Sequence, residues 1–484
     1  MKIKELFKEL ECEKIDLNED IEISSIAVND YECKDGSIFF CLKRNEEERM
    51  KYIKKAISLG AVVIISNKIV NNCAVAQIVV ENPRALLSIV CKRFYKNPQK
   101  KLFKIAVVGT NGKTTICELI YRILNTYGKK CGKIGTLGAE FNEKHFQTGF
   151  TTPDAPQLYQ YLRQMVNDGV EFLVMELSAH AIYYRKADFK FDIAIFTNCS
   201  PEHLDFFADY EEYKQVKISA FDSTAAKIAI VNADDITGKE IICLRRSGVI
   251  SYGLDDPCDI FAIDFYENNH GISFLMNLFD ELYQINSSYL GKFNVYNMLA
   301  AASACAIAGV NVDFIAEQLR GLSFVDGRME KVCNKINVFI DYAHTPDGLE
   351  KALISLKNIK GNKRLICVFG CGGNRDKQKR APMGKISGKL SDFTVITTDN
   401  SRFEDENSII SEIEGGIREV THEYIAIRDR AQAIEYAVQI ANAGDYLLIA
   451  GKGAEEYQEL MGVFKPFSDR EIAKRVVKNK YDEF

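Results

Sequence analysis

Short apolar runs alternate with amphipathic stretches along the first hundred residues. The runs SIFFCL (37–42), AVVIIS (61–66) and AQIVVE (76–81) have the length and the β-branched content of strands. Residues 50–60, which lie between two of these runs, carry apolar positions at helical spacing. This alternation predicts a small α/β unit that ends near residue 102.

The same alternation continues on a larger scale up to residue 325. The runs KIAVV, FLVMEL, IAIFTN and AKIAIVN are separated by helical stretches, as expected for a doubly wound parallel sheet. Residues 259–291 alternate with period two instead, which predicts a few antiparallel strands before the next helix. A third α/β stretch follows, with strands at NVFIDY, RLICVFG, FTVITTD and DYLLIAG. We therefore predict an α/β protein of three domains, at 1–102, 103–325 and 326–484.

Composition and charge exclude several classes of protein. Hydrophobic residues make up 47% of the 484 residues and charged residues 27%, a balance typical of globular proteins. A net charge of −5 gives no overall field for nucleic acid, so any anion must be bound by local groups. We found no export signal and no long apolar span, which predicts a cytoplasmic protein without membrane insertion. The 14 scattered cysteines, with no CxxC pair, predict reduced and mostly buried thiols.

The strongest chemical signal is the segment GTNGKTT (109–115), which lies between an apolar strand and a helix. Its glycines let backbone N–H groups approach phosphate oxygens, and a helix N-terminus favours negative charge. Lys113 can reach terminal phosphates, and Thr114 can bind Mg²⁺. Val107 occupies the position of the first glycine in the full GxxxxGK[ST] pattern. A glycine turn alone can be purely structural, but GKTT directly after a strand favours a phosphate-binding loop.

Three further residues have both a functional and a structural interpretation. Glu176 and His203 follow apolar runs, and the carboxyl ends of strands are where ligands gather in open α/β sheets. A buried hydrogen-bonded acid and a capping histidine would give the same pattern. Lys217 lies on a predicted helix, where its pattern alone favours a solvated surface lysine. Two later clusters, at 341–347 and 371–376, again follow strands and suggest anion binding.

Taken together, the motifs resemble the Mur ligase family over most of the chain. They follow one another in the order of the family: GTNGKTT (109–115), TTPDAPQL (151–158), MELSAHA (175–181), NCSPEHLDFF (198–207), NADD (232–235), FNVYNMLAA (293–301), DGRMEKV (326–332), DYAHTPDGL (341–349), FGCGGNRDKQKR (369–380), DNSRFED (399–405) and AGKGAEEYQ (450–458).

The resemblance implies a function for each predicted domain and a set of nucleotide and metal ligands. Residues 1–102 would hold the UDP-sugar end of a substrate, 103–325 would form a P-loop ATPase-type parallel sheet, and 326–484 would form a Rossmann-like domain that brings an amino acid. Lys113, His203 and Lys217 would be catalytic. Thr114 and Glu176 would hold one Mg²⁺, and His203 a second together with Lys217, which is carbamylated in this family. ATP would be bound by Gly109, Thr110, Asn111, Gly112, Lys113, Thr114, Thr115, Asn297, Arg328, Asp341 and His344.

The reaction that the resemblance implies is ATP-dependent ligation of an acid to an amino acid, in peptidoglycan precursor synthesis. ATP would phosphorylate a carboxylate of UDP-N-acetylmuramoyl-L-alanyl-D-glutamate to an acyl phosphate, which an amine then attacks. Arg402 favours meso-diaminopimelate over lysine as that amine, because a guanidinium can bind the distal carboxylate of diaminopimelate. The expected partners are therefore small molecules, and we expect a monomer. The substrate residues would be Thr151, Thr152, Ser178, Lys186, Arg375, Asp399, Asn400, Arg402, Gly451 and Glu455.

The chain departs from the family pattern mainly where the nucleotide-sugar substrate is expected. Val28-Asn29-Asp30 stands where the family usually has Asp-Ser-Arg, and Ala179, Tyr184 and Lys186 replace a serine, a glutamine and an arginine. A lysine does not reproduce the bidentate fork of an arginine. Two alternatives therefore stay open: a relative that acts on a different or modified peptidyl acceptor, and an inactive nucleotide-binding scaffold. A ligase like folylpolyglutamate synthase would share the ATPase core, but DYAHTPDGL and DNSR disfavour it.

Overall fold

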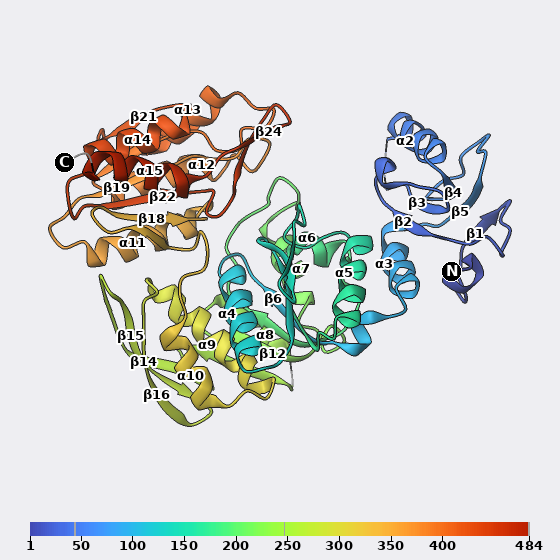
Figure 1. The fold of residues 1–484 in the computed structure, drawn as a ribbon, viewed down its shortest axis with the longest axis horizontal. Helices are drawn as coiled ribbons and strands as arrows, with labels where there is room; N and C mark the ends of the chain where they lie inside the picture. Colours follow the sequence, from blue (N-terminus) through green and yellow to red (C-terminus); the bar gives the residue numbers. More distant parts are fainter. Residues whose placement is uncertain (43–44, 246, 483–484) are drawn as a thin grey trace. The chain divides into compact units, whose positions relative to one another are not determined.

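The computed structural model describes residues 1–42, 45–245 and 247–482. The chain forms two compact units. The first unit contains residues 1–106, 128–194 and 222–227, and the second contains 107–127, 195–221 and 228–484. Both combine helices with mostly parallel sheets, which confirms the predicted α/β class (Figure 1). Strands β6 (Phe103–Val108) and β11 (Phe191–Phe196) each contribute residues to both units.

The first unit begins with a five-stranded sheet in the order β1-β5-β4-β3-β2. The strands pair in parallel except for β1, which is antiparallel to β5. Helix α2 buries Ile53 and Ala56 against Phe39 and Ile64 of the sheet. The predicted strands and helix of this region are therefore confirmed. The elements are α1 (Ile3–Leu6), β1 (Glu13–Ile15), β2 (Ser25–Ala27), η1 (Asp30–Glu32), β3 (Ser37–Phe40), α2 (Glu46–Ser58), β4 (Ala61–Ser66) and β5 (Ala76–Val79).

The rest of the first unit contains a second group of strands with three helices. Strand β10 pairs in parallel with β7, and β7, β8 and β9 then follow as antiparallel neighbours. The strands β7 to β9 were not predicted from the sequence. Helix α3 packs on α5. The elements are α3 (Pro83–Phe94), η2 (Pro98–Lys101), β7 (Cys131–Gly135), β8 (Gly138–Phe141), β9 (Lys144–Phe146), α5 (Ala155–Asn167), β10 (Phe172–Glu176) and α6 (Ala179–Tyr183).

The second unit begins with the turn from β6 into α4 and continues with the strands that follow β11. Strands β12, β13 and β14 pair in parallel, whereas β14, β15 and β16 pair antiparallel, as the period-two pattern at 259–291 predicted. Helix α9 packs on α4 and on β14 and β15. The elements are α4 (Lys113–Thr126), α7 (Tyr210–Ser219), β12 (Ala226–Asn232), α8 (Ile236–Leu244), β13 (Val249–Gly253), β14 (Ile260–Asn268), β15 (Gly271–Leu278), β16 (Glu281–Ser287), α9 (Lys292–Ile307) and α10 (Val312–Gly321).

A six-stranded sheet in the order β17-β18-β22-β19-β20-β21 forms the C-terminal part of the second unit. Successive side chains of a strand point to opposite faces, so Leu365, Cys367 and Phe369 of β19 pack under α11, α12 and α13. Ile366 and Val368 pack on the other face, under α14 and α15. A parallel sheet covered on both faces needs such continuous apolar runs. The elements are β17 (Glu330–Cys333), β18 (Asn337–Asp341), α11 (Pro346–Ile359), β19 (Leu365–Phe369), α12 (Arg380–Leu390), β20 (Phe393–Ile396), α13 (Glu406–Ile417), β21 (Tyr424–Ala426), α14 (Arg430–Ile440), β22 (Tyr446–Ala450), β23 (Tyr457–Leu460), β24 (Val463–Pro466) and α15 (Asp469–Asp482).

The cysteines agree with the expectation from the sequence. All 14 lie in the described part of the chain, where none of them forms a disulfide; most of them are buried, and Cys243 on α8 is the exposed one. Among the described residues, no helix has the length and apolar character needed to cross a membrane.

Candidate active site

The segment GTNGKTT forms the turn between β6 and α4, as predicted. Gly109 and Gly112 have φ values of +154° and +89°, and a Cβ on Gly109 would lie 1.8 Å from Thr197 Oγ1. Only glycine fits a backbone that is both left-handed and this close to its neighbours. Lys113 Nζ donates to the carbonyl oxygens of Gly109 and Thr110, at 2.8 Å each. The Lys113 ammonium is therefore held against the backbone of the loop, at the start of α4.

Lys217 is buried beside this loop, so the surface interpretation of its pattern is wrong. Its side chain on α7 is 1% exposed, and its Nζ donates to Thr110 Oγ1 at 2.7 Å. The Nζ also lies 4.1 Å from the centre of the Tyr213 ring. Burial, reinforced by the nearby charge of Lys113, lowers the pKa of Lys217 to about 7. A large share of this amine is thus uncharged and nucleophilic at neutral pH.

Glu202 joins the loop after β11 to the segment after β18, and sequence reasoning missed it. Its Oε1 lies 3.1 Å from His344 Nε2, and its Oε2 lies 3.6 Å from His203 Nε2. Burial opposes ionisation of Glu202, but His203, His344 and Lys113 outweigh it and hold the pKa of this carboxyl well below its usual value. The only signal in the sequence was the position of Glu202 directly before a predicted metal ligand. His203 itself has a φ of +59°.

Contacts from the C-terminal part of the second unit also reach the loop. Arg328 Nη2 donates to Thr114 Oγ1 at 2.9 Å, and its guanidinium packs on the Tyr342 ring. Asn111 Nδ2 donates to Asp347 Oδ2 at 2.8 Å, at the start of α11. The structure therefore brings predicted nucleotide residues from both ends of this unit to one place.

Asn297 and Asp341, two more predicted nucleotide ligands, are both buried and hydrogen-bonded. Asn297 Nδ2 donates to Asn294 Oδ1 at 2.9 Å, and a Cβ on Gly112 would lie 2.5 Å from Asn297 Oδ1. The carboxylate of Asp341 accepts from the backbone N–H groups of Met329 and Ala343, at 2.6 Å and 2.7 Å. Burial nevertheless raises the pKa of Asp341. Asp341 thus fixes the two loops from which Arg328 and His344 project.

The predicted acceptor residues form one hydrogen-bonded group in the first unit. Thr152 Oγ1 donates to the carbonyl oxygen of Glu176 at 2.8 Å and accepts from Ser178 N at 3.1 Å. The carboxylate of Glu176, 1% exposed, accepts from the backbone and the hydroxyl of Thr136, at 2.8 Å and 3.1 Å. The Thr136 and Thr151 hydroxyls are 3.0 Å apart. Thr136 was not predicted, although it holds two predicted residues in place.

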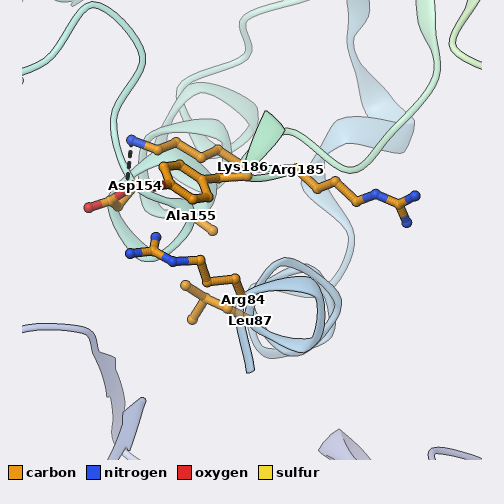
Figure 2. A pocket seen from close by; sticks show the side chains of 7 residues that line it. Arg84, Leu87, Asp154, Ala155, Arg185 and Lys186 are labelled. Atoms are coloured by element: carbon orange, nitrogen blue, oxygen red, sulfur yellow. Dashed lines mark ion pairs between the residues drawn. The ribbon is translucent and has the colours of Figure 1, made fainter. Parts of the chain in front are cut away.

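Lys186 lines a pocket at the edge of this group, between the first turn of α3 and the start of α5 (Figure 2). Its Nζ pairs with Asp154 at 2.7 Å and donates to the carbonyl oxygen of Thr152 at 3.4 Å. Arg84 lies across the pocket from it (Figure 2).

Three of the residues that the sequence predicts to bind the amino-acid substrate contact a buried lysine, which was not itself predicted. Lys452 is fully buried, and its Nζ contacts Asp399, Asn400 and Glu455 at 3.3, 3.0 and 3.0 Å. Burial disfavours the charged form of Asp399, but Lys452 and Arg430 outweigh it and lower its pKa. The signal was present in AGKGAEE, where Lys452 directly follows the predicted ligand Gly451.

Arg402 and Arg375 differ in how firmly they are held. Arg402 Nη1 donates to the carbonyl oxygen of Gly373 at 2.9 Å, and its Nε lies 3.2 Å from Glu459. Arg375 is exposed. Gly451, with a φ of +116°, would place a Cβ 3.2 Å from Asp399 Oδ2. Of the two arginines, Arg402 is therefore the one already oriented by the fold.

The donor atoms of the predicted metal ligands fit a hard cation only in part. Thr114 in the second unit and Glu176 in the first each offer an oxygen, which Mg²⁺ prefers. The amine of Lys217 fits such an ion only as a carbamate, whose oxygens would be the ligands. Burial and an uncharged amine are the conditions under which a lysine can accept carbon dioxide.

Comparisons with known proteins place this site in a family of ligases. A model of the Mur ligase middle domain matches residues 107–305, and a model of the Mur ligase glutamate ligase domain matches residues 327–453. A curated relative from Alkaliphilus oremlandii is 39% identical over 99% of both chains. The chain therefore belongs to the Mur ligase family.

The names of the relatives are more specific. The relative from Alkaliphilus oremlandii and one from Caldanaerobacter subterraneus, 35% identical over 99% of both chains, are each named UDP-N-acetylmuramoyl-L-alanyl-D-glutamate--2,6-diaminopimelate ligase. A solved structure of a ligase with that name covers 99% of both chains with a TM-score of 0.69 and 29% sequence identity.

Proposed function

We propose that this chain is an ATP-dependent ligase that joins meso-diaminopimelate to UDP-N-acetylmuramoyl-L-alanyl-D-glutamate, in peptidoglycan precursor synthesis. The observation that carries the proposal is the match over 99% of both chains to a ligase named for these two substrates. The γ-phosphoryl group of ATP would pass to a glutamyl carboxylate, giving ADP and an acyl phosphate. The amine of diaminopimelate would then attack the acyl carbon and release phosphate, leaving an amide.

The loop residues have the chemistry that the first step requires. Backbone N–H groups of Gly109 to Thr115 would bind phosphate oxygens, and Lys113 would turn from its own loop carbonyls to the terminal phosphates. Arg328, now on Thr114, supplies a second cation from the C-terminal part of the unit. Bound Mg²⁺ would neutralise charge on the phosphoryl group as it moves. As the family resemblance implies, Thr114 and Glu176 are the proposed ligands of one Mg²⁺, and His203 and carbamylated Lys217 those of a second.

The C-terminal cluster supports the choice of diaminopimelate. Arg402 presents a guanidinium to bind a distal carboxylate, and a lysine substrate would bring an ammonium that Arg402 repels. Asn400 Nδ2 and Lys452 Nζ both contact Glu455 Oε2 at 3.0 Å, which orients that carboxylate toward an amino-acid ammonium. Asp399, Gly451 and Arg375 complete the proposed amino-acid site.

We further propose three domains at 1–102, 103–325 and 326–484, a monomer, and a cytoplasmic location. The separate five-stranded and six-stranded sheets support the first and the last of these domains. The proposed substrates, ATP and a UDP-linked sugar, support the location. Sedimentation of the purified chain would test the monomer.

A ligation assay tests the proposal directly. The purified protein, ATP and Mg²⁺ are incubated with UDP-N-acetylmuramoyl-L-alanyl-D-glutamate and either meso-diaminopimelate or L-lysine, and the product is identified by mass. We expect product and phosphate release with diaminopimelate. A Lys113→Ala variant should remain folded, because the Lys113 side chain is only partly buried, and should lose ATP turnover. If ATP releases no phosphate in the presence of either amino acid, the proposal is overturned and an inactive scaffold is favoured.

A different or modified peptidyl acceptor is the second candidate function. Ala179, Tyr184 and Lys186 depart from the family pattern, and Lys186 is already paired with Asp154. An acceptor panel that varies the peptide on the UDP-muramyl group would separate the two functions. Faster turnover with another peptide than with L-alanyl-D-glutamate would favour this second candidate.

A further inference from the structure

The pocket beside the acceptor residues contains a cation that no residue of the described chain neutralises. Arg84, in the first turn of α3, and Lys186 both line this pocket (Figure 2). Lys186 is the cation expected from the sequence, but Asp154 lies 2.7 Å from its Nζ and balances its charge. The pair leaves Lys186 with little net attraction for a second anion. Arg84 and Arg185 carry the remaining positive charge, but Arg185 lines the pocket with its guanidinium extending away from the other side chains, so Arg84 is the cation directed at Lys186 and Asp154 (Figure 2).

Arg84 is held in place by an aromatic ring rather than by an acid. Its guanidinium carbon lies 4.1 Å from the centre of the Tyr184 ring, and the side chain is half-buried. Within residues 1–42, 45–245 and 247–482, Arg84 forms neither an ion pair nor a side-chain hydrogen bond. A guanidinium held by the π-electrons of a ring rather than by an acid keeps its N–H groups available for an acceptor. The stacking also removes part of the entropy cost of ordering a long side chain before a ligand binds.

These contacts indicate the class of ligand that the pocket can take. The side chains of Arg84, Lys186 and Asp154 carry a net charge of +1, and the free donors form a planar fork. Such a fork matches the paired oxygens of a phosphate or a carboxylate. Tyr184 would cover one face of the guanidinium, so the anion must approach from its edge.

We propose that Arg84 is the principal anion-binding residue of this pocket and contacts an oxyanion of the acceptor substrate. The inference rests on the proposed function in one respect: the proposed acceptor carries both a diphosphate and carboxylates. Lys186 then acts indirectly, by neutralising Asp154, which would otherwise repel the anion. Arg84 thus belongs to the acceptor site, although the first domain predicted from the sequence contains it and no motif pointed to it.

Steady-state kinetics of Arg84→Ala and of Arg84→Gln test the inference. We expect the KM for UDP-N-acetylmuramoyl-L-alanyl-D-glutamate to rise at least about tenfold in both variants, since a charge-assisted bidentate contact is lost. The KM values for ATP and diaminopimelate and the value of kcat should stay within about twofold, because the contacts of Arg84 described above lie in the pocket of the acceptor residues. Arg185→Ala is the matched control: its guanidinium extends away from the Arg84, Lys186 and Asp154 group (Figure 2). This variant should behave like the parent.

Equilibrium binding separates the two sources of oxyanion. UDP offers the diphosphate alone, and L-alanyl-D-glutamate offers the carboxylates alone. Weaker binding of either probe to Arg84→Ala, with Arg185→Ala unchanged, supports the inference and identifies the anion. Unchanged KM and unchanged binding of both probes in Arg84→Ala would overturn it, as would parent-like behaviour of Arg84→Gln. If the parent protein does not ligate the UDP-muramyl dipeptide at all, the proposed function fails, but the UDP result still decides whether Arg84 binds an oxyanion.

Discussion

Lys217 shows how burial can change the chemistry of a single side chain. An exposed lysine stays protonated at neutral pH, whereas Lys217, with its amine against Thr110 and the Tyr213 ring, has a pKa of about 7. Only the uncharged amine can add carbon dioxide. Burial disfavours the charged form of Lys217, and the uncharged amine that results is the form that can become the proposed carbamate.

Replacing Lys217 by alanine should abolish most ligation. We expect a loss of at least about 100-fold in kcat, because the proposed carbamate oxygens that hold Mg²⁺ disappear. Phosphate release with saturating substrates measures it, and added bicarbonate should not restore the activity. Lys214→Ala is the control on the same helix, since Lys214 pairs with Glu211 and Glu240. Parent-like turnover by Lys217→Ala would remove this residue from the catalytic group.

Arg402 should decide between amino-acid substrates. Loss of its charge-assisted contact with the distal carboxylate should cost about 2 kcal/mol, so Arg402→Ala ought to use diaminopimelate at least about tenfold less efficiently. The measurement is the ratio of kcat/KM for diaminopimelate and lysine, compared with the exposed control Arg418→Ala. An unchanged ratio would show that Arg402 does not bind the distal carboxylate.

At the scale of elements, periodicity predicted most of the strands but few of the contacts between them. AKIAIVN became β12, and the period-two stretch became β14 to β16, because these elements bury the faces that their own patterns define. The short β7 to β9 and the hairpin of β23 and β24 have weak patterns of their own and were missed.

Among the site residues too, those within a local sequence pattern could be predicted and those defined by distant contacts could not. The loop at 109–115 could be predicted because glycines, lysine and threonines are contiguous between a strand and a helix. Glu202 and Lys452 had only a neighbouring predicted residue as a signal, because their contacts come from residues more than 50 positions away, His344 and Asp399 respectively. The burial of Lys217 likewise depends on the packing of α7 beside the loop, which its own helix does not encode.

The segment between β20 and α13 contains an ion pair that should make stability depend on pH. Arg380 of α12, fully buried, donates to both oxygens of Glu404 at 2.8 Å, and Lys377 adds a third contact. The hydrogen bonds from Arg380, which outweigh the opposing effect of burial, hold the pKa of Glu404 far below its usual value. A depressed carboxyl pKa stabilises the fold above the unfolded pKa, and this contribution is lost as pH falls toward the folded pKa.

Glu404→Gln should therefore destabilise the protein at pH 7 by about 2 kcal/mol. The difference from the parent should shrink as the pH is lowered below about 4.3, the ordinary pKa of glutamate, because the parent then loses the same contribution. Urea unfolding at several pH values measures both. The exposed pair of Glu419 and Lys385 provides the control, since solvent screens this pair and Glu419→Gln should leave stability nearly unchanged. A difference that does not vary with pH would contradict this account.

At the scale of the whole molecule, the chain is a set of separately covered sheets. The six-stranded sheet has helices on both faces, and each face has its own core of alternating side chains. The proposed binding residues lie at or beyond the carboxyl ends of the strands rather than in these cores, as for Asp341 at the end of β18 and Asn400 after β20. The cores can therefore stay fixed while substrates exchange.

The thiols differ in exposure, so a thiol reagent should label the native protein selectively at one cysteine. Burial raises the pKa of Cys371 to about 11 and that of Cys91 well above its ordinary value, which suppresses their thiolates. Cys243 is exposed on α8. Treatment of the native protein with a maleimide fluorophore should thus modify one equivalent rapidly at Cys243, as peptide mass mapping would verify, and Cys243→Ser should remove this fast phase. Rapid uptake of several equivalents would show that the half-buried or the buried thiols are also open to reagent. A dye attached at this position would therefore mark the protein at one defined site without any engineered cysteine.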